Sequence, residues 1–222
     1  MTPPSLRLLA ITVLVLAGCA NKPPPPDWQM NAQDALERAV QAYLSGNTRL
    51  EALESAKVRA EVSSTGRADL LARAELVRCA ARVASLVLEP CAGFAALSQD
   101  AAAPERAYAD YLAGRAQPRD AALLPPQHRA VASGGAAAAG LKDMTDPLAR
   151  LVAAGVLMQA GRADPTVIAL AIDTASAQGW RRPLLAWLGV QAQRAESAGD
   201  AAEAARIRRR MALAGDPPAR AP

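Results

Sequence analysis

A chain of 222 residues is long enough to form one domain of ordinary size with a real hydrophobic core. Aromatic residues make up 3% of it, whereas Ala, the best helix former, contributes about a quarter. Runs of β-branched and aromatic residues are absent, so the composition predicts an all-α protein in which small side chains let helix backbones approach closely. The net charge of +4 is spread along the chain. Because no basic patch is interleaved with aromatic residues, we expect no nucleic-acid partner.

The first residues have the pattern of a lipoprotein signal peptide. Arg7 is followed by an apolar run over 8–16 that is too short to span a membrane. The stretch Leu16-Ala17-Gly18-Cys19 resembles the bacterial lipobox. That resemblance implies cleavage of residues 1–18, with diacylglycerol on the Cys19 thiol and an acyl chain such as palmitate on its new amino group. The alternative is a secreted protein that is cleaved nearby and keeps an ordinary Cys19.

The residues after the lipobox predict where the anchored protein lies. Ala20 stands where an Asp would, by the same resemblance, imply retention in the inner membrane. We therefore expect an outer-membrane anchor that faces the periplasm, held permanently because several acyl chains are buried in lipid. Residues 19–27 form the lipidated Cys and a tether, in which Pro23–Pro26 are a stiff polyproline spacer.

An N-terminal helical lobe is expected over residues 28–114. Apolar periodicity and glycine stops predict helices over about 31–44 and 49–63, a third from about 68, and a shorter one over 104–112. The third helix is apolar on two faces, so it should be buried between neighbours.

Cys79 and Cys91 are the other two cysteines, and in an oxidising compartment a bridge between them is favoured over two buried thiols. If the helix that carries Cys79 continued to Glu89, the two Cα atoms would be too far apart for a disulfide. A bridge therefore predicts that this helix ends near Ser85 or Leu86.

Residues 115–145 have weaker periodicity and contain several breakers, which predicts an irregular joint between two lobes or packed irregular chain. His128, the only histidine, follows Pro125-Pro126 in this stretch. Since metal sites and catalytic triads need further ligands or a base, we interpret it as a loop residue.

A C-terminal lobe of helical hairpins is expected over residues 146–216, followed by a disordered tail over 217–222. Pro147, Pro165 and Pro183 recur at intervals of 18, and the Asp residues before the first two are good N-caps. With Arg182 as the third N-cap and Asp200 as the fourth, this spacing predicts four helices that end at glycines. Pairs of such units resemble tetratricopeptide repeats, so the expected fold is a right-handed tetratricopeptide-like array or an α-α bundle.

Two groups of side chains are candidates for partner binding. Arg206, Arg209 and Arg210 could meet an acidic partner or anionic lipid, although cations near a helix C-terminus also offset the helix dipole. Tyr108 and Tyr111 would mark a binding surface if exposed, whereas buried aromatic side chains would be core wedges. Trp180 and Trp187 have the same two interpretations.

These observations predict an interaction protein, not an enzyme, with no metal and no cofactor beyond the lipid on Cys19. The leading hypothesis is a scaffold or assembly factor that binds membrane lipid through its anchor and another envelope protein through its helices. The alternative is a module that binds an anionic lipid headgroup or glycan through the Arg-rich helix face.

Overall fold

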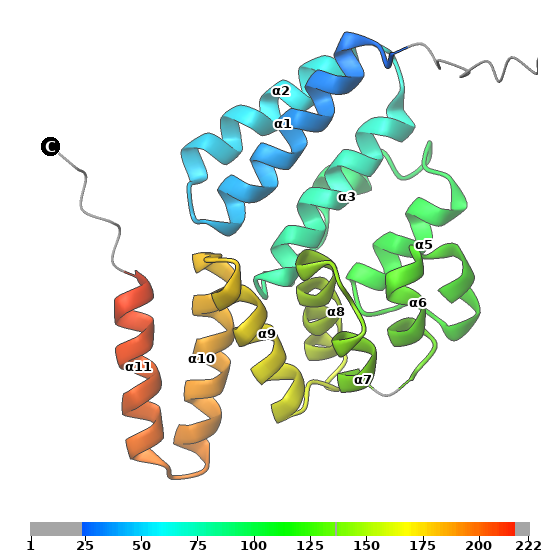
Figure 1. Cartoon of the computed structure of the whole chain (residues 1–222). Helices are drawn as coiled ribbons and strands as arrows, with labels where there is room; N and C mark the ends of the chain where they lie inside the picture. The colour runs from blue at the N-terminus through cyan, green and yellow to red at the C-terminus, as the bar shows by residue number, and fades with distance from the viewer. Residues whose placement is uncertain (1–23, 136, 216–222) are drawn as a thin grey trace, which may run out of the picture.

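The computed structural model describes residues 24–135 and 137–215, and all regular structure within these ranges is helical. This confirms the all-α prediction. The elements are α1 Asp27–Leu44, α2 Thr48–Ser63, α3 Ala68–Ala84, α4 Ala92–Ala95, α5 Ala103–Leu112, the 3-10 helix η1 Pro118–Leu123, α6 Pro126–Ala132, α7 Ala137–Lys142, α8 Pro147–Gln159, α9 Pro165–Ala177, α10 Arg181–Ser197 and α11 Ala201–Gly215. Successive long helices form hairpins, as Figure 1 shows for α1–α2 and α10–α11. The predicted signal peptide, Cys19 and the tail 217–222 lie outside the described residues.

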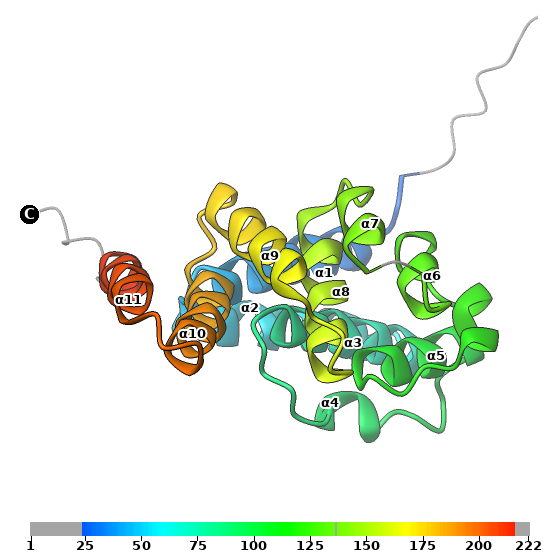
Figure 2. The same ribbon diagram turned by 90° about the horizontal axis from the view of Figure 1, so that it is seen from below.

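Helix α3 lies at the centre of the molecule, with α1 and α2 on one side, α5 on another, and α8 crossing it (Figures 1 and 2). Its buried side chains include Leu76, Cys79 and Val83, together with several alanines. The prediction that a helix apolar on two faces is buried between neighbours is therefore confirmed.

The crossing of α3 and α8 shows what an Ala-rich core permits. Gly155 of α8 faces the backbone of α3 so closely that a Cβ atom added to it would lie 2.3 Å from the carbonyl oxygen of Val83. The neighbouring Ala153 and Ala154 are fully buried at the same place. Because small side chains leave no space between the helices, the two backbones pack almost directly against each other.

The C-terminal helices begin and end close to the predicted positions. The side chain of Asp146 accepts a hydrogen bond from the backbone N–H of Leu148, and that of Asp164 accepts one from Val167. Gly161 and Gly179 follow α8 and α9 with φ of +67° and +63°, the left-handed conformation that closes a helix most readily at glycine.

One N-cap differs from the prediction. Trp180, and not Arg182, is the N-cap residue of α10, which begins at Arg181. The indole of Trp180 is 6% exposed and donates a hydrogen bond from Nε1 to Gln41 Oε1, at 3.0 Å. Burial of this side chain against α1 fixes where the chain turns, so Pro183 is the third residue of the helix and not the first.

The segment 115–145 is mostly helical, because η1, α6 and α7 lie within it. Leu124, Val131 and Leu141 are buried in the same hydrophobic core that contains side chains of α3 and α8. His128 belongs to α6 and is 2% exposed, so the interpretation of it as a loop residue is wrong. Pro126 occupies the first turn of α6, where a proline begins a helix instead of breaking one.

The α1–α2 hairpin contacts the beginning of α10 as well as α3. The guanidinium of Arg182 lies 4.2 Å from the centre of the Tyr43 ring, and its Nη2 donates to Thr48 Oγ1 at 3.2 Å. Trp187, fully buried one turn further along α10, donates from Nε1 to the carbonyl oxygen of Ala84 at 3.0 Å. These contacts join the first hairpin and the end of α3 to the C-terminal helices.

Candidate functional site

The structure places Cys79 and Cys91 at disulfide distance, with their Cα atoms 5.8 Å apart. Helix α3 ends at Ala84, as a bridge requires, and the chain turns back at Leu86, whose φ is +58°. The backbone N–H of Val87 donates to the carbonyl oxygen of Arg82, which closes the helix end in the Schellman pattern. The predicted position of this helix end is confirmed.

The α10–α11 hairpin forms one end of the array, and α11 packs principally against α10 (Figure 1). Ala204 and Ile207 are the buried residues of α11. The opposite side of the helix is exposed at Arg206, Arg209 and Leu213, which recur at the three- and four-residue spacing of one helix face. We call these three residues the α11 outer face.

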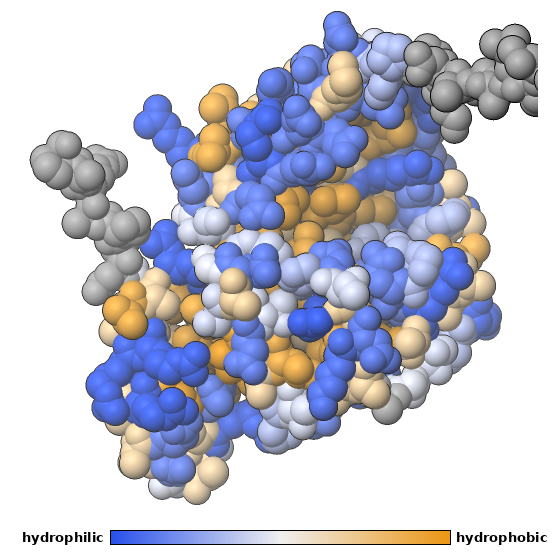
Figure 3. Space-filling model, viewed as in Figure 1, coloured by the Kyte–Doolittle hydropathy of each residue, from blue (hydrophilic) through white to orange (hydrophobic). Residues whose placement is uncertain are grey.

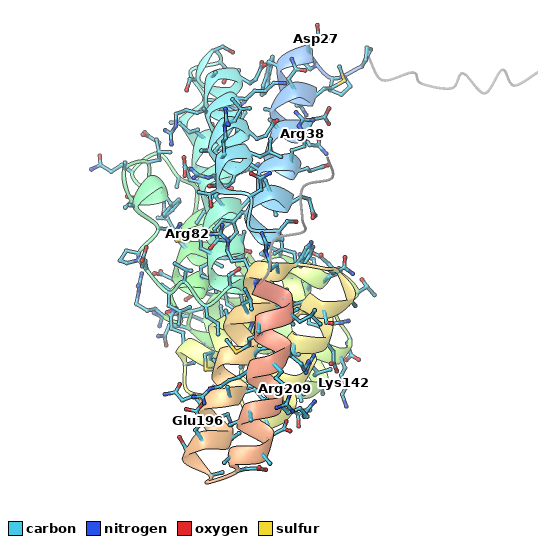
Figure 4. The ribbon with its side chains drawn as sticks, turned by 90° about the vertical axis from the view of Figure 1, so that its left-hand side faces the viewer. Asp27, Arg38, Arg82, Lys142, Glu196 and Arg209 are labelled. Carbon is cyan, nitrogen blue, oxygen red and sulfur yellow. A yellow bond between two sulfur atoms is a disulfide. The ribbon has the colours of Figure 1, made fainter. Side chains whose placement is uncertain are left out.

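The α11 outer face combines charge with an isolated apolar side chain. Leu213 is 81% exposed, and Figure 3 shows hydrophilic residues over much of the α11 end of the molecule with hydrophobic ones among them. Figure 4 looks onto α11 from outside, with Arg209 labelled on it and Glu196 on α10. Within the described residues Arg209 is in no ion pair.

Arg206 and the neighbouring Arg208 are partly neutralised by carboxylates. Arg206 donates from Nε and Nη2 to the carboxylate of Glu203, at 2.6 and 2.5 Å, and Arg208 pairs with Glu196 at 2.7 Å. These bonds from Arg206, with the charge of half-buried Arg210 adding to them, lower the pKa of Glu203. Arg209 is therefore the cation of the cluster most available to a partner.

An open groove lies at the base of the same hairpin. It has a volume of about 770 Å³, and its walls come from the end of α8, the start of α9, the second half of α10 and the turn into α11. Its lining combines apolar and charged side chains: Met158, Ile168, Val190, Arg194, Asp200 and Glu203. The predicted Arg cluster and this groove thus lie on one hairpin.

Tyr108 and Tyr111 do not form an exposed surface. Tyr111 is 1% exposed, and its hydroxyl is 3.2 Å from Nδ1 of His128. The Tyr108 ring is stacked on that of Tyr111, with centroids 6.1 Å apart, and lies 5.7 Å from the His128 ring. Because this cluster is packed into the core, the tyrosines act as core wedges, as do Trp180 and Trp187.

Burial changes the ionisation of the aromatic cluster. It raises the pKa of both tyrosines, and it lowers the pKa of His128 to about 4 against the opposing influence of the Asp146 carboxylate. His128 is therefore neutral at physiological pH. A single neutral imidazole bonded to a tyrosine inside the core has no access to a substrate.

Sequence reasoning missed two buried carboxylates on the central helices. Glu75 and Glu105 are 8% and 7% exposed. Glu75 pairs with Arg59 and Arg78, whereas Glu105 pairs with Arg73 at 2.5 Å. Helical periodicity could have indicated the burial of Glu75, because it places this residue on the same helix face as Ala72 and Cys79.

Within the described ranges, the His, Cys, Asp and Glu side chains form no group of three or more that could hold a metal ion. Across the same residues, the helices lack the combination of length and hydrophobicity needed to cross a bilayer. Comparison of the chain with protein-family models, with curated proteins and with solved structures finds no match.

Proposed function

We propose that this chain is an outer-membrane lipoprotein whose periplasmic helical domain is a scaffold that binds another envelope protein through the α11 outer face. The observation that carries the proposal is the one-sided packing of α11, which leaves Arg209 and Leu213 directed away from the rest of the domain. An exposed arginine is a typical anchor for a protein interface, and Leu213, 81% exposed on the same face, adds apolar area beside it.

The chemistry of this face specifies the partner. Arg206 and Arg209 favour a surface that carries carboxylates, because long-range attraction steers association and a guanidinium binds a carboxylate with two hydrogen bonds. Leu213 requires a shallow apolar pocket between those carboxylates. The proposal assigns no catalytic step to the chain.

The proposed anchor rests on the lipobox-like stretch Leu16–Cys19 and on the proline spacer that follows it. Two or more acyl chains hold a protein on a membrane almost permanently. The spacer would then keep the helical domain a few residues' length from the lipid surface. If replacing Cys19 with Ser abolishes labelling by radioactive palmitate and releases the protein from the membrane, the anchor is supported. If labelling survives, the lipoprotein assignment fails.

The scaffold proposal is tested by photocrosslinking in intact cells. A photoreactive amino acid replaces Leu213, and in a matched control it replaces Leu53 of α2, which is 65% exposed. We expect one discrete protein adduct from position 213 and none from position 53. The charge reversal Arg209→Glu, with the folding of the protein checked by circular dichroism, should reduce that adduct at least several-fold.

The α11 outer face also permits the alternative function, binding of an anionic lipid headgroup or glycan, because Arg209 has no ion-pair partner in the described part of the chain. Cosedimentation with vesicles that contain anionic lipid distinguishes the two. Salt-sensitive binding lost on changing Arg206, Arg209 and Arg210 to Ala would favour the alternative, and a protein adduct without such binding would favour the scaffold.

A further inference from the structure

The groove at the base of the α10–α11 hairpin has the chemistry that the α11 outer face requires of a partner. Figure 1 shows this end of the hairpin, where the chain turns from α10 into α11. The carboxylates of Asp200, in that turn, and of Glu203, in the first turn of α11, line part of the groove. Five of its apolar side chains are half-buried or exposed, so that a partner can reach them: Met158, Pro165, Val190, Ala195 and Ala198. The groove is therefore an apolar surface beside carboxylates.

Asp200 is the carboxylate of the groove that is available to an incoming cation. The carboxylate of Glu203 already accepts two hydrogen bonds from Arg206. Asp200 Oδ1 accepts from the backbone N–H of Glu203 at 2.9 Å, and among the described residues the Asp200 carboxylate is in no ion pair. The third charged lining residue, Arg194, is exposed on α10, six residues before Asp200. A guanidinium that enters beside Asp200 therefore gains a charge-assisted hydrogen bond.

The outer face of one copy of the chain cannot fill the groove of the same copy. Leu213 follows Glu203 by ten residues on one continuous helix, which separates the two residues by about 15 Å. The outer face also points away from α10, whereas α10 forms a wall of the groove. The groove of each copy is therefore open to the outer face of another.

We propose that the partner of the α11 outer face is a second copy of this chain, which receives that face in its groove. This inference rests on the proposed function, since it names the protein that the outer face binds. Leu213, 81% exposed in the single chain, is buried against Met158 and Val190 of the second copy. Arg209 donates to the Asp200 carboxylate of that copy, and the aliphatic part of its side chain covers the apolar wall beside it.

The contact joins two different surfaces, so a copy that contributes its outer face still offers its own groove. Repetition of such a head-to-tail contact gives a ring or an open row of copies. One helix face in one groove buries less area than a standard interface of about 1,600 Å², so the contact is weak in solution. Copies held on one membrane by short tethers have a high effective concentration, which makes a weak contact effective there.

The experiment identifies by mass the photocrosslinked adduct that forms from position 213 of the full-length chain in intact cells. We expect an adduct of two chains, in which the crosslinked peptide of the second copy contains a residue that lines the groove, such as Met158 or Val190. An adduct with a different protein alone would overturn this inference and leave the proposed function standing. The absence of any adduct would overturn both.

Two variants separate the two surfaces of the contact. Ala198→Trp obstructs the groove of a copy and leaves its outer face intact, whereas Arg209→Glu alters the outer face and leaves the groove intact. Both positions are exposed, so both variants should be as stable as the parent chain. Ala169→Trp, at an exposed position outside the groove lining and the outer face, is the matched control and should leave the amount of adduct unchanged.

The variants are compared in cells that lack the parent chain, with the photoreactive residue carried by the Ala198→Trp copy. Alone, this copy should give about tenfold less two-chain adduct than the parent, because no groove is open to its outer face. Adding an Arg209→Glu copy, which has an open groove and no photoreactive residue, should restore the adduct. An undiminished adduct from Ala198→Trp alone, no recovery in the mixture, or crosslinks confined to residues outside the groove would each overturn the proposal.

Discussion

Gly155→Ala should destabilise the protein, even though it replaces a helix-interior glycine with the best helix former. The added Cβ would lie 2.3 Å from the Val83 carbonyl oxygen, and ordinary contact begins at 3.4 Å, so α3 and α8 must separate by about 1.1 Å. Overpacking of this kind costs about 1–3 kcal/mol. We expect about 3 kcal/mol or more, because the nearest obstructing atom belongs to the backbone and cannot move aside as a side chain can. The higher helix propensity of Ala offsets only about 1 kcal/mol of this cost.

The matched control is Gly189→Ala in α10, where the added Cβ would meet Met211 Cε at 3.8 Å, an ordinary contact. That variant should gain about 1 kcal/mol from helix propensity. By thermal unfolding at a common pH, Gly155→Ala should melt about 4–8 °C below the parent, a net loss of about 2 kcal/mol, and Gly189→Ala about 2–4 °C above it. A Gly155→Ala protein as stable as the parent would refute the close approach of α3 and α8.

Three further predictions follow from the described contacts. When the unreduced, denatured protein is alkylated, mass measurement should show Cys79 and Cys91 unmodified, and alkylation of both would exclude the bridge. Cys91→Ser should lower the free energy of unfolding by about 3 kcal/mol, the loop entropy expected for a separation of 12 residues. Asp164→Ala should cost about 1 kcal/mol in urea unfolding through loss of the N-cap to Val167, with a cost below about 0.3 kcal/mol contradicting that cap. The pKa of His128 is about 4 in the folded protein, below its unfolded value, so the unfolded chain binds the extra proton as pH falls. The free energy of unfolding should therefore decline from pH 6.5 towards 4, by about 2 kcal/mol between pH 7 and 4.5. The decline should be smaller in His128→Asn.

Most of the helices could be predicted from local features. Asp146 and Asp164 cap helices whose first residue is proline, and that combination depends on the nearest few residues alone. The helix end near Leu86 has no glycine to indicate it. It could be predicted only by assuming that Cys79 and Cys91 are bridged, and the geometry of that assumption then required the chain to turn back.

The features that sequence could not give are those set by long-range packing. The breakers in residues 115–145 predict irregular chain, whereas Pro126 begins α6, a helix whose His128 and Val131 are buried. The sequence left two interpretations of Tyr111, an exposed binding residue or a core wedge, and in the structure it is 1% exposed and its hydroxyl lies 3.2 Å from His128 Nδ1. Among the candidate site residues, the pairing of Arg206 with Glu203 is local, since the two are three residues apart on α11, whereas the pairing of Arg208 with Glu196 depends on the hairpin partner α10.

The contacts between the first hairpin and α10 have a consequence for how the chain folds. The hydrogen bond from Trp180 to Gln41 joins residues 139 apart in sequence, and that from Trp187 to Ala84 joins residues 103 apart. A repeat array with only neighbour contacts can form piece by piece from any point. Here the α1–α2 hairpin contacts α10. During synthesis, the packing of the N-terminal helices can therefore be completed only after α10 has been made. We expect a single cooperative unfolding transition, and folding slower than that of a helical array of the same length with only local contacts.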